Sequence, residues 1–418
     1  MRLAVFTNQF PGRLNTFFAR DLRALIECGI ELDVFAFYPL RADYWAAVPA
    51  LLDATVLPRH KVHHLSPAQL LQSGGPWPPA LAVPFLKSMS PLLGASARLS
   101  GALAMKSAYV SAWAWACIKR FGAERFDHVL AYWGNHAASA AYLFHQHTQP
   151  GVPFSMMVHA RMDLYHQPAF LDAKLAYADN IFIVCEYNRG YLRERFPALY
   201  PHIASRIQVH HLGLPLEQIP VTLDGRAEDH LLAVGHLEPL KGFAVLVRAL
   251  GLLRERGLTP ALEIVGGGPD DASLRTLARE CGVAGQVTLR GWLSADQVMA
   301  RMQGATMLVH PSIAPDAMPT VVKEALACGA PVVASDLAGI PEMLDGGRCG
   351  VLTPPGDVEA LATALERLLR NPVARRQLGA AGRAHMEAHF NLWENGRRLA
   401  ERLRTSRRDS RAPVRTVA

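Results

Sequence analysis

Cysteine is scarce in this sequence, and the few that occur are scattered. There are six in 418 residues, with no C-x-x-C pair and no spacing of the kind that zinc fingers use. This excludes a disulfide framework and a small zinc-binding module, and it favours a reduced, cytoplasmic setting.

Long hydrophobic runs are also missing. No uncharged apolar stretch reaches the roughly eighteen residues that a transmembrane helix needs, so none is expected. The amino-terminal segment Met1–Asn8 has an apolar run of only four residues before polar ones. It predicts a first β-strand and not a signal peptide.

Positive charge is sparse outside the carboxyl terminus. The formal net charge is +7, but residues 397–418 hold eight arginines against Glu401 and Asp409, which leaves the rest of the chain nearly neutral. A nucleic-acid-binding protein carries its basic residues as a patch on the folded domains, so this class is not favoured. The basic tail has two interpretations, contact with anionic lipid headgroups or a solvated chain end.

Motifs typical of two other enzyme classes are absent. The first strand-to-helix loop contains Gly12 alone and no G-x-G-x-x-G, which argues against a nicotinamide dehydrogenase. There is no D-x-D, and no group of His, Cys and Asp residues has the spacing of metal ligands. We therefore expect neither a bound metal nor another cofactor.

The chain alternates regularly between strands and helices. The first half predicts a strand, a helix and a strand, and then further strand–helix units, at 3–7, 16–28, 31–37, 127–147, 153–157 and 180–195. Residues 40–82 are poorly periodic, and residues 85–121 predict helix. A new first strand begins at Leu231, followed by strands near 261–266, 286–290, 306–310, 331–335 and 350–352. This alternation predicts an α/β fold.

Two domains are expected, with a boundary within 215–228, where prolines and a polar stretch interrupt the pattern. We predict an amino-terminal domain over 1–220 and a carboxyl-terminal domain over 221–390. Residues 391–418 are expected to form a helix that packs back toward the first domain, followed by the basic tail. Half of the residues are apolar, so each domain can have its own core.

The segment from Pro315 to Asp336 carries the most functional information. Asp316 lies in a loop, Pro319 suits the first turn of a helix, and Glu324 follows Asp316 by eight positions. Gly329 then suits the end of that helix. The two carboxylates are placed to hold two ends of one extended ligand, with the helix start holding an anion. An ordinary strand–helix unit with two solvated acids is the alternative.

This segment resembles the signature of glycosyltransferase family 4, E-G-x-P followed by E-A-(M/L)-A-x-G-x-P-V-V-A. Asp316 to Pro319 stands at the first part, with Asp for Glu and Ala317 for Gly, and Glu324 to Ala334 matches the second. The resemblance implies a GT-B fold, two facing Rossmann-like doubly wound domains with an interdomain cleft. It also implies a nucleotide-sugar donor. Asp316 would meet the donor sugar and Glu324 the ribose, with Ala317, Met318, Pro319 and Thr320 beside the donor.

A second match begins at the first strand of the second half. The segment Leu231–Phe243 resembles the family's V-G-R-L-x-x-x-K-G, in which Arg and Lys neutralise the leaving diphosphate. Gly235 and Lys241 match, while His236 replaces the arginine. Histidine is only partly charged near neutral pH, which weakens one of the two cations.

Two further turns of the second half resemble donor-binding segments. A strand ends in three glycines, Gly266, Gly267 and Gly268, which permit close approach of the backbone. After the next strand, Leu293 stands where the family's backbone reads the base. An ordinary turn is the alternative for each.

The first half contributes a histidine. The strand that ends at His159 resembles the family's H-A-x-D pattern, which places His159 at the donor sugar or the reaction centre. Asp163 either orients this histidine or caps the next helix. Arg189, in a segment that resembles S-E-(F/Y)-N-R, meets a phosphate or forms an ion pair. The first loop, with Gly12, Asn15 and Thr16, resembles a donor- or acceptor-contacting F-P-x-x-S-E-T-F loop.

These matches predict a retaining, metal-independent glycosyltransferase similar to bacterial exopolysaccharide, capsule and colanic-acid enzymes. It would transfer a hexose from a UDP- or GDP-sugar to a saccharide acceptor, expected to be lipid-linked, and would be cytoplasmic or peripheral at the inner membrane face. Residues 85–121 either touch that membrane or form core helices. The alternatives are another Rossmann sugar-nucleotide enzyme, such as an epimerase, and a non-catalytic sugar-nucleotide-binding protein.

Overall fold

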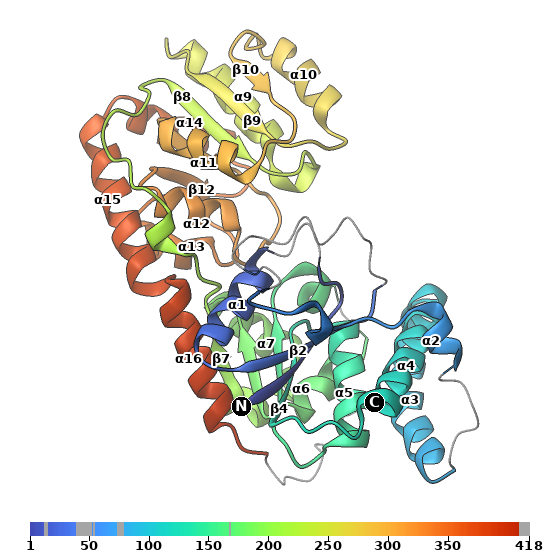
Figure 1. The fold of residues 1–418 in the computed structure, drawn as a ribbon. Helices are drawn as coiled ribbons and strands as arrows, with labels where there is room; N and C mark the ends of the chain where they lie inside the picture. Colours follow the sequence, from blue (N-terminus) through green and yellow to red (C-terminus); the bar gives the residue numbers. More distant parts are fainter. Residues whose placement is uncertain (12–15, 39–51, 53–54, 73–78, 167–168, 409–418) are drawn as a thin grey trace. The chain divides into compact units, whose positions relative to one another are not determined.

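The computed structural model describes all residues except 12–15, 39–51, 53–54, 73–78, 167–168 and 409–418 (Figure 1). Contacts between residues separate the chain into two units. Unit 1 comprises Met1–Gly213 together with Leu392–Ala418, and unit 2 comprises Leu214–Asn391. The chain therefore leaves unit 1 once and returns to it at the carboxyl end.

Unit 1 is built on a parallel sheet of seven strands in the order β3-β2-β1-β4-β5-β6-β7. In this sheet Val5 pairs with Val34 on one side and Leu130 on the other. The central strands are buried along nearly their whole length, which is why their sequences are continuous apolar runs. The strands are β1 Arg2–Thr7, β2 Glu31–Ala36, β3 Val62–His63, β4 His128–Ala131, β5 Phe154–Val158, β6 Asn180–Ile183 and β7 Ile207–Val209.

Helices cover this sheet and complete its core. Phe6 stacks on Phe35 with ring centroids 4.8 Å apart, and Trp113 and Phe144 pack around this pair. The helices are α1 Thr16–Glu27, α2 Pro67–Gln72, α3 Pro79–Leu99, α4 Gly101–Phe121, α5 His136–Thr148, α6 Leu171–Tyr177, α7 Glu186–Arg195, α8 Tyr200–Ile203 and α16 Leu392–Thr405. The last of these lies against α1.

The helical prediction for residues 85–121 is confirmed, except at Ser100. The structure forms two helices there, α3 and α4, because Ser100 breaks the run and caps α4 by accepting a hydrogen bond from Leu103 N at 3.1 Å. The second half of α4 belongs to the core, as the fully buried Trp113 shows. The first half of α4 exposes Met105.

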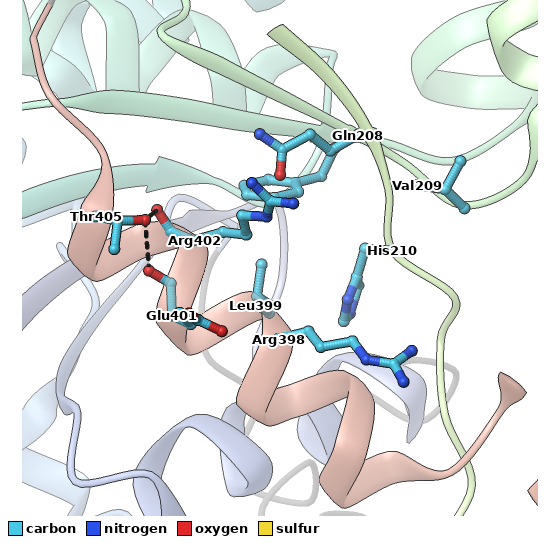
Figure 2. A pocket seen from close by; sticks show the side chains of 9 residues that line it. Gln208, Val209, His210, Arg398, Leu399, Glu401, Arg402 and Thr405 are labelled. Carbon is cyan, nitrogen blue, oxygen red and sulfur yellow. Dashed lines mark hydrogen bonds between the residues drawn. The ribbon is translucent and has the colours of Figure 1, made fainter. Parts of the chain in front are cut away.

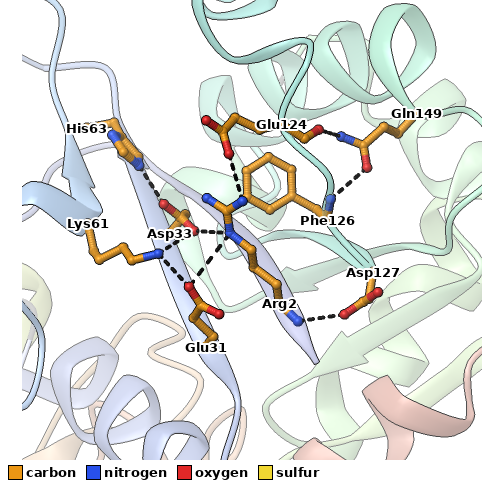
Figure 3. A network of polar contacts seen from close by, with 9 residues as sticks. All are labelled: Arg2, Glu31, Asp33, Lys61, His63, Glu124, Phe126, Asp127 and Gln149. Carbon is orange, nitrogen blue, oxygen red and sulfur yellow. Dashed lines mark hydrogen bonds and ion pairs between the residues drawn. The ribbon is translucent and has the colours of Figure 1, made fainter.

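A polar network ties the amino ends of the first strands (Figure 3). Asp33 of β2 accepts from Arg2 Nε at 2.8 Å, and its other oxygen lies 2.8 Å from His63 Nε2. Burial by itself raises the pKa of Asp33, but the hydrogen bonds from His63 and Arg2 overcome this effect and hold the pKa at about 2. This edge is opposite to the carboxyl ends of the strands, so it serves the fold.

Unit 2 repeats the plan with six parallel strands in the order β10-β9-β8-β11-β12-β13. The strands are β8 His230–Val234, β9 Ala261–Val265, β10 Val287–Leu289, β11 Met307–His310, β12 Val332–Ser335 and β13 Val351–Thr353. The helices are α9 Phe243–Glu255, α10 Asp271–Glu280, α11 Ala295–Gly304, α12 Thr320–Ala327, α13 Ile340–Met343, α14 Val358–Leu369 and α15 Pro372–His389. The predicted α/β fold with doubly wound parallel sheets is confirmed.

Turn residues of the sequence end the elements where expected. Gly329 follows α12 with φ +75°, and Gly242 precedes α9 with φ +68°, both in the left-handed region that favours glycine. Within the described part of the chain, no helix has both the length and the apolarity needed to cross a bilayer.

Candidate functional site

The candidate site of unit 2 lies where the strand order of its sheet reverses, between β8 and β11. Ligands of doubly wound sheets bind at the carboxyl ends of the strands beside such a reversal. The loop after β8 and the loop after β11 are held together there. Leu240 O accepts from Ile313 N at 2.9 Å and from Ser312 Oγ at 3.0 Å.

Two predicted donor-site residues meet across these loops. Lys241 Nζ donates to Asp316 Oδ2 at 2.8 Å. Both side chains are partly exposed, 19% for Lys241 and 33% for Asp316, so a ligand can reach them. A cation and an acid therefore stand side by side at the reversal point of the sheet.

Sequence reasoning missed a third residue at this place, His310, which ends β11. It is only 4% exposed, and its Nε2 has no hydrogen-bond partner among the described residues. Burial, together with the positive charge of Lys241, lowers the pKa of His310 to about 4 against an opposing effect of Asp316. The only signal in the sequence was its position at a strand end, directly before Pro311.

The three glycines after β9 cannot carry side chains without displacing the backbone or Trp292. A Cβ on Gly266 would lie 1.9 Å from Gly235 O, and one on Gly268 would lie 2.3 Å from Leu237 O. Gly266 also has φ +139°. A Cβ on Gly267 would meet the Trp292 indole at 2.6 Å. The glycine turn therefore lies directly against the loop that follows β8.

Aromatic rings flank this turn. The ring of His236, at the expected arginine position, is stacked with Trp292 at a centroid distance of 6.0 Å. Trp292 is 69% exposed, which is unusual for so large an apolar side chain and leaves its face open to a planar ligand. Leu293 is half-buried next to it.

The loop and helix of the signature segment form the remaining wall. Ala317 and Met318 are buried against Gly339, whose Cβ would lie 1.9 Å from Ala317 O. Pro319 caps α12 and Thr320 begins it. Glu324 is half-buried one turn inside the helix, as the spacing predicted.

The candidate site of unit 1 centres on His159, directly after β5. Its Nδ1 donates to Asp163 Oδ2 at 3.0 Å, and the backbone N–H groups of His159 and Ala160 donate to the same carboxylate. Asp163 therefore orients the ring. In the neutral ring this contact places the proton on Nδ1 and leaves Nε2 as the acceptor. Nε2 is buried and has no partner within the described part of the chain.

Aromatic side chains enclose His159. Trp133 lies over its ring at a centroid distance of 4.4 Å, and Tyr132 and Phe17 lie at 5.2 and 5.5 Å. Trp133 Nε1 donates to Thr7 Oγ1 at 3.2 Å, which joins the ends of β4 and β1. The order of the strands reverses between β1 and β4, so this site lies at the position that unit 2 also uses.

The other predicted residues of unit 1 are less informative. Arg189 donates to Glu186 at 2.6 Å, which matches the ion-pair interpretation left open by the sequence. Thr16 begins α1. Gly12 and Asn15 lie outside the described residues. The roles of these residues at a donor or acceptor stay predictions.

A pocket of about 470 Å³ in unit 1 lies elsewhere, between β7 and α16 (Figure 2). Gln208, Arg398 and Arg402 line it, together with His210, whose Nε2 is 2.9 Å from Asp21 Oδ2. Asp21 also accepts a hydrogen bond from the Tyr132 hydroxyl at 2.5 Å. No predicted site residue lines this pocket.

A metal site is not evident in the described ranges, where no three His, Cys, Asp or Glu side chains are gathered as ligands would be. Metal independence stays a prediction.

The geometry thus defines a class: two doubly wound units, each with functional side chains at the reversal point of its sheet. Comparison with solved structures identifies it as the GT-B fold. Sucrose-phosphate synthase of Thermosynechococcus elongatus superposes with TM-score 0.68 at 20% identity, covering 97% of this chain and 98% of that one. HepE of Anabaena, in complex with UDP, gives TM-score 0.65 at 16% identity over 97% and 99% of the two chains.

Within that class, residues 222–385, which lie in unit 2, match the family described as Glycosyl transferases group 1. A GDP-mannose-dependent alpha-(1-6)-phosphatidylinositol monomannoside mannosyltransferase of Mycolicibacterium smegmatis is 32% identical over 53% of this chain and 62% of its own length. The amylovoran biosynthesis glycosyltransferase AmsK of Erwinia amylovora is 30% identical over 47% and 50%. The chain thus matches about half to three fifths of these relatives. The family resemblance predicted from the signature segment is confirmed.

Proposed function

We propose that the protein is a retaining, metal-independent glycosyltransferase that transfers a hexose from a UDP- or GDP-sugar to a lipid-linked saccharide acceptor in the synthesis of exopolysaccharide, capsule or lipopolysaccharide. The observation that carries this proposal is the Lys241–Asp316 pair at the reversal point of the unit 2 sheet. The relatives named above act in exopolysaccharide or glycolipid synthesis by their descriptions, and HepE is described with UDP.

The chemistry assigns separate tasks to these residues. When the bond between sugar and diphosphate breaks, negative charge grows on the departing phosphate, and Lys241 is the cation placed to stabilise it. Asp316 would accept hydrogen bonds from hydroxyls of the donor sugar. Glu324, one turn inside α12, would accept from the ribose.

His159 would contribute from unit 1. Because Asp163 holds Nδ1, the free Nε2 can accept a hydroxyl proton or, when protonated, donate to an oxygen at the reaction centre. No side chain is assigned as a nucleophile, and retention of configuration rests on the family resemblance.

A nucleotide-release assay tests the proposal. The purified protein is incubated with UDP-, GDP- and ADP-sugars and a membrane extract as the source of acceptor, with and without EDTA. We expect release from one donor, unchanged by EDTA and abolished in Glu324→Ala, while Glu280→Ala on the exposed face of α10 retains activity. Release from no donor, or release that EDTA abolishes, would contradict the proposal.

A second candidate, a sugar-nucleotide-binding protein without catalysis, is favoured by one observation. His236 stands where the family has arginine, and it is stacked with Trp292. Thermal unfolding separates the candidates, because any ligand of the native state raises the melting temperature. A donor that raises it without turnover in the presence of acceptor extract would support the binding protein.

A further inference from the structure

Helices α3 and α4 form a hairpin whose inner and outer faces differ in kind. Both helices contact α5 (Figure 1). The side chains of Phe85, Leu92 and Trp113 are buried in the core of unit 1. Other apolar side chains of the two helices are exposed in the part of the chain that the structure describes. The exposed fractions are 44% for Leu81, 52% for Val83, 47% for Leu86, 51% for Leu99, 71% for Met105 and 38% for Tyr109, whose hydroxyl donates to Phe37 O at 3.1 Å. These six residues, with Lys87, Arg98 and Lys106, are called the hairpin surface.

The charge of the hairpin surface has a single sign. Lys87, Arg98 and Lys106 are exposed among the apolar residues. The sequence contains no Asp or Glu between Asp53 and Glu124, whereas the rest of the chain outside its tail has more acidic than basic residues. Exposed apolar side chains surrounded only by cations are complementary to a partner that is apolar inside and anionic at its surface.

The hairpin surface continues into a pocket at the end of α3. Arg98 and Leu99 line this pocket of about 380 Å³, together with aromatic and aliphatic side chains of α6, α7 and their flanking turns. Its cations are Arg98 and Arg195, and its acid is Asp172. Such a combination suits an anionic headgroup attached to an apolar chain.

We propose that the hairpin surface docks onto an anionic lipid bilayer. Neither α3 nor α4 is long and apolar enough to span a membrane, so the hairpin lies in the headgroup layer with Val83, Leu86 and Met105 toward the acyl chains. The lysines and Arg98 meet the lipid phosphates, where each basic residue near the surface contributes about 1 kcal/mol, or about fivefold in partitioning. This docking does not depend on the proposed transferase activity.

Vesicle sedimentation of the full chain tests the proposal without any sugar nucleotide. We expect binding to vesicles of phosphatidylcholine with phosphatidylglycerol and little binding to phosphatidylcholine alone. The triple variant Lys87→Gln/Arg98→Gln/Lys106→Gln should lose at least about tenfold in partitioning. The variant Val83→Gln/Leu86→Gln/Met105→Gln should lose a similar factor, since it removes the inserted apolar area.

Matched controls separate the hairpin from general charge. Arg254→Gln/Arg279→Gln/Arg367→Gln removes the same charge from exposed positions of unit 2 and should bind like the unaltered protein. Circular dichroism and the melting temperature show whether each variant is folded. Met105→Gln alone removes less apolar area than the triple variant and should reduce partitioning by a smaller factor.

Three outcomes would overturn the proposal. Hairpin variants that bind as well as the unaltered protein would assign membrane contact to the basic tail. Absence of binding to anionic vesicles would reject a lipid partner. A concentration-dependent dimer that the apolar variant abolishes would show that a second copy of the chain covers the hairpin surface.

Discussion

Lys241 and Asp316 stabilise each other before any donor is bound, yet their proposed ligands are different parts of the donor. Without a donor, Asp316 therefore neutralises the positive charge of Lys241 that would stabilise the diphosphate. A donor gains a sugar contact at Asp316 and a phosphate contact at Lys241 while it weakens the pair between them. The contributions of Asp316 and Lys241 can be separated by comparing the binding affinity of the free nucleotide with that of the nucleotide sugar.

We predict that Asp316→Asn binds free UDP or GDP a few-fold more tightly, because the acid no longer opposes the phosphate charge. The same variant should turn over its donor more slowly. Lys241→Met should weaken nucleotide binding by about tenfold or more, the usual loss for a hydrogen bond to a charged group. Isothermal titration of the nucleotide measures both, with Glu280→Gln as control. Equal weakening by both changes would contradict this arrangement.

Gly266 provides a second residue-scale prediction. Gly266→Ala places a Cβ against the carbonyl of Gly235 in a backbone conformation that alanine avoids. We expect a loss of several kcal/mol of unfolding free energy in unit 2 and loss of donor binding. Gly285→Ala, where a Cβ meets nothing within 4 Å, is the control and should change stability by less than about 0.5 kcal/mol. Urea unfolding monitors both variants.

Residues with a local pattern could be predicted from the sequence, and residues placed by long-range packing could not. His159 and Asp163 are four positions apart, so their contact follows from one segment. Trp133 reaches His159 only because β4 and β5 are neighbours in the sheet. His310 likewise meets the charge of Lys241 only because the loop after β8, far away in sequence, lies beside the end of β11.

Among the elements, α16 shows how closely two helices pack when one of them carries glycine. A Cβ on Gly396 would lie 2.4 Å from the Cβ of Ala24 on α1. The helices can approach at this distance only while position 396 has no side chain. The contact fixes the carboxyl-terminal helix on unit 1.

We predict that Gly396→Ala destabilises unit 1 by about 1–3 kcal/mol, the usual cost of overpacking. Adding Ala24→Gly should restore much of that loss, because it removes the opposing Cβ, although glycine in a helix has its own cost of about 1 kcal/mol. Gly94→Ala, where a Cβ meets nothing within 4 Å, should be neutral or stabilising. Urea midpoints measure the set, and absence of rescue in the double variant would refute the proposed contact.

Most strands were predicted, including the three-residue strands β10 and β13, but β3 and β7 were not. The strand at 31–37 is β2 with one residue fewer, and the strand at 331–335 is β12, also one residue shorter. Strand β7, Ile207–Val209, was not predicted, and its pairing with β6 defines it. Helices were predicted over 85–121 without a position for the break at Ser100, because the residues on both sides favour helix equally.

For the whole molecule, buried histidines make stability depend on pH. Burial lowers the pKa of His145 to about 4 and of His128 to about 3. In the unfolded chain these groups titrate near 6.5. As pH falls below 6.5, these histidines bind protons in the unfolded state but stay neutral in the folded state. Their contribution to the unfolding free energy is therefore fully present above pH 6.5 and declines toward pH 4.

We predict a lower urea midpoint at pH 5 than at pH 7.5, with each such histidine contributing up to about 1.4 kcal/mol per pH unit. His145→Gln should reduce this pH dependence, although it also loses the contacts to Tyr177 and Val152. His60→Gln, at an exposed position, is the control. A pH dependence unchanged in His145→Gln would exclude His145 as a contributor.

The return of the chain to unit 1 has a consequence during synthesis. Helix α16 is made only after the whole of unit 2. At ordinary translation speeds, on the order of 10–40 s pass between Gly213 and α16. During this interval the surface of α1 around Ala24 has no helix to cover it, and all strands of unit 2 are made before α16 begins. Unit 2 can therefore finish folding on the ribosome first, and the part of the protein that begins earliest is completed last.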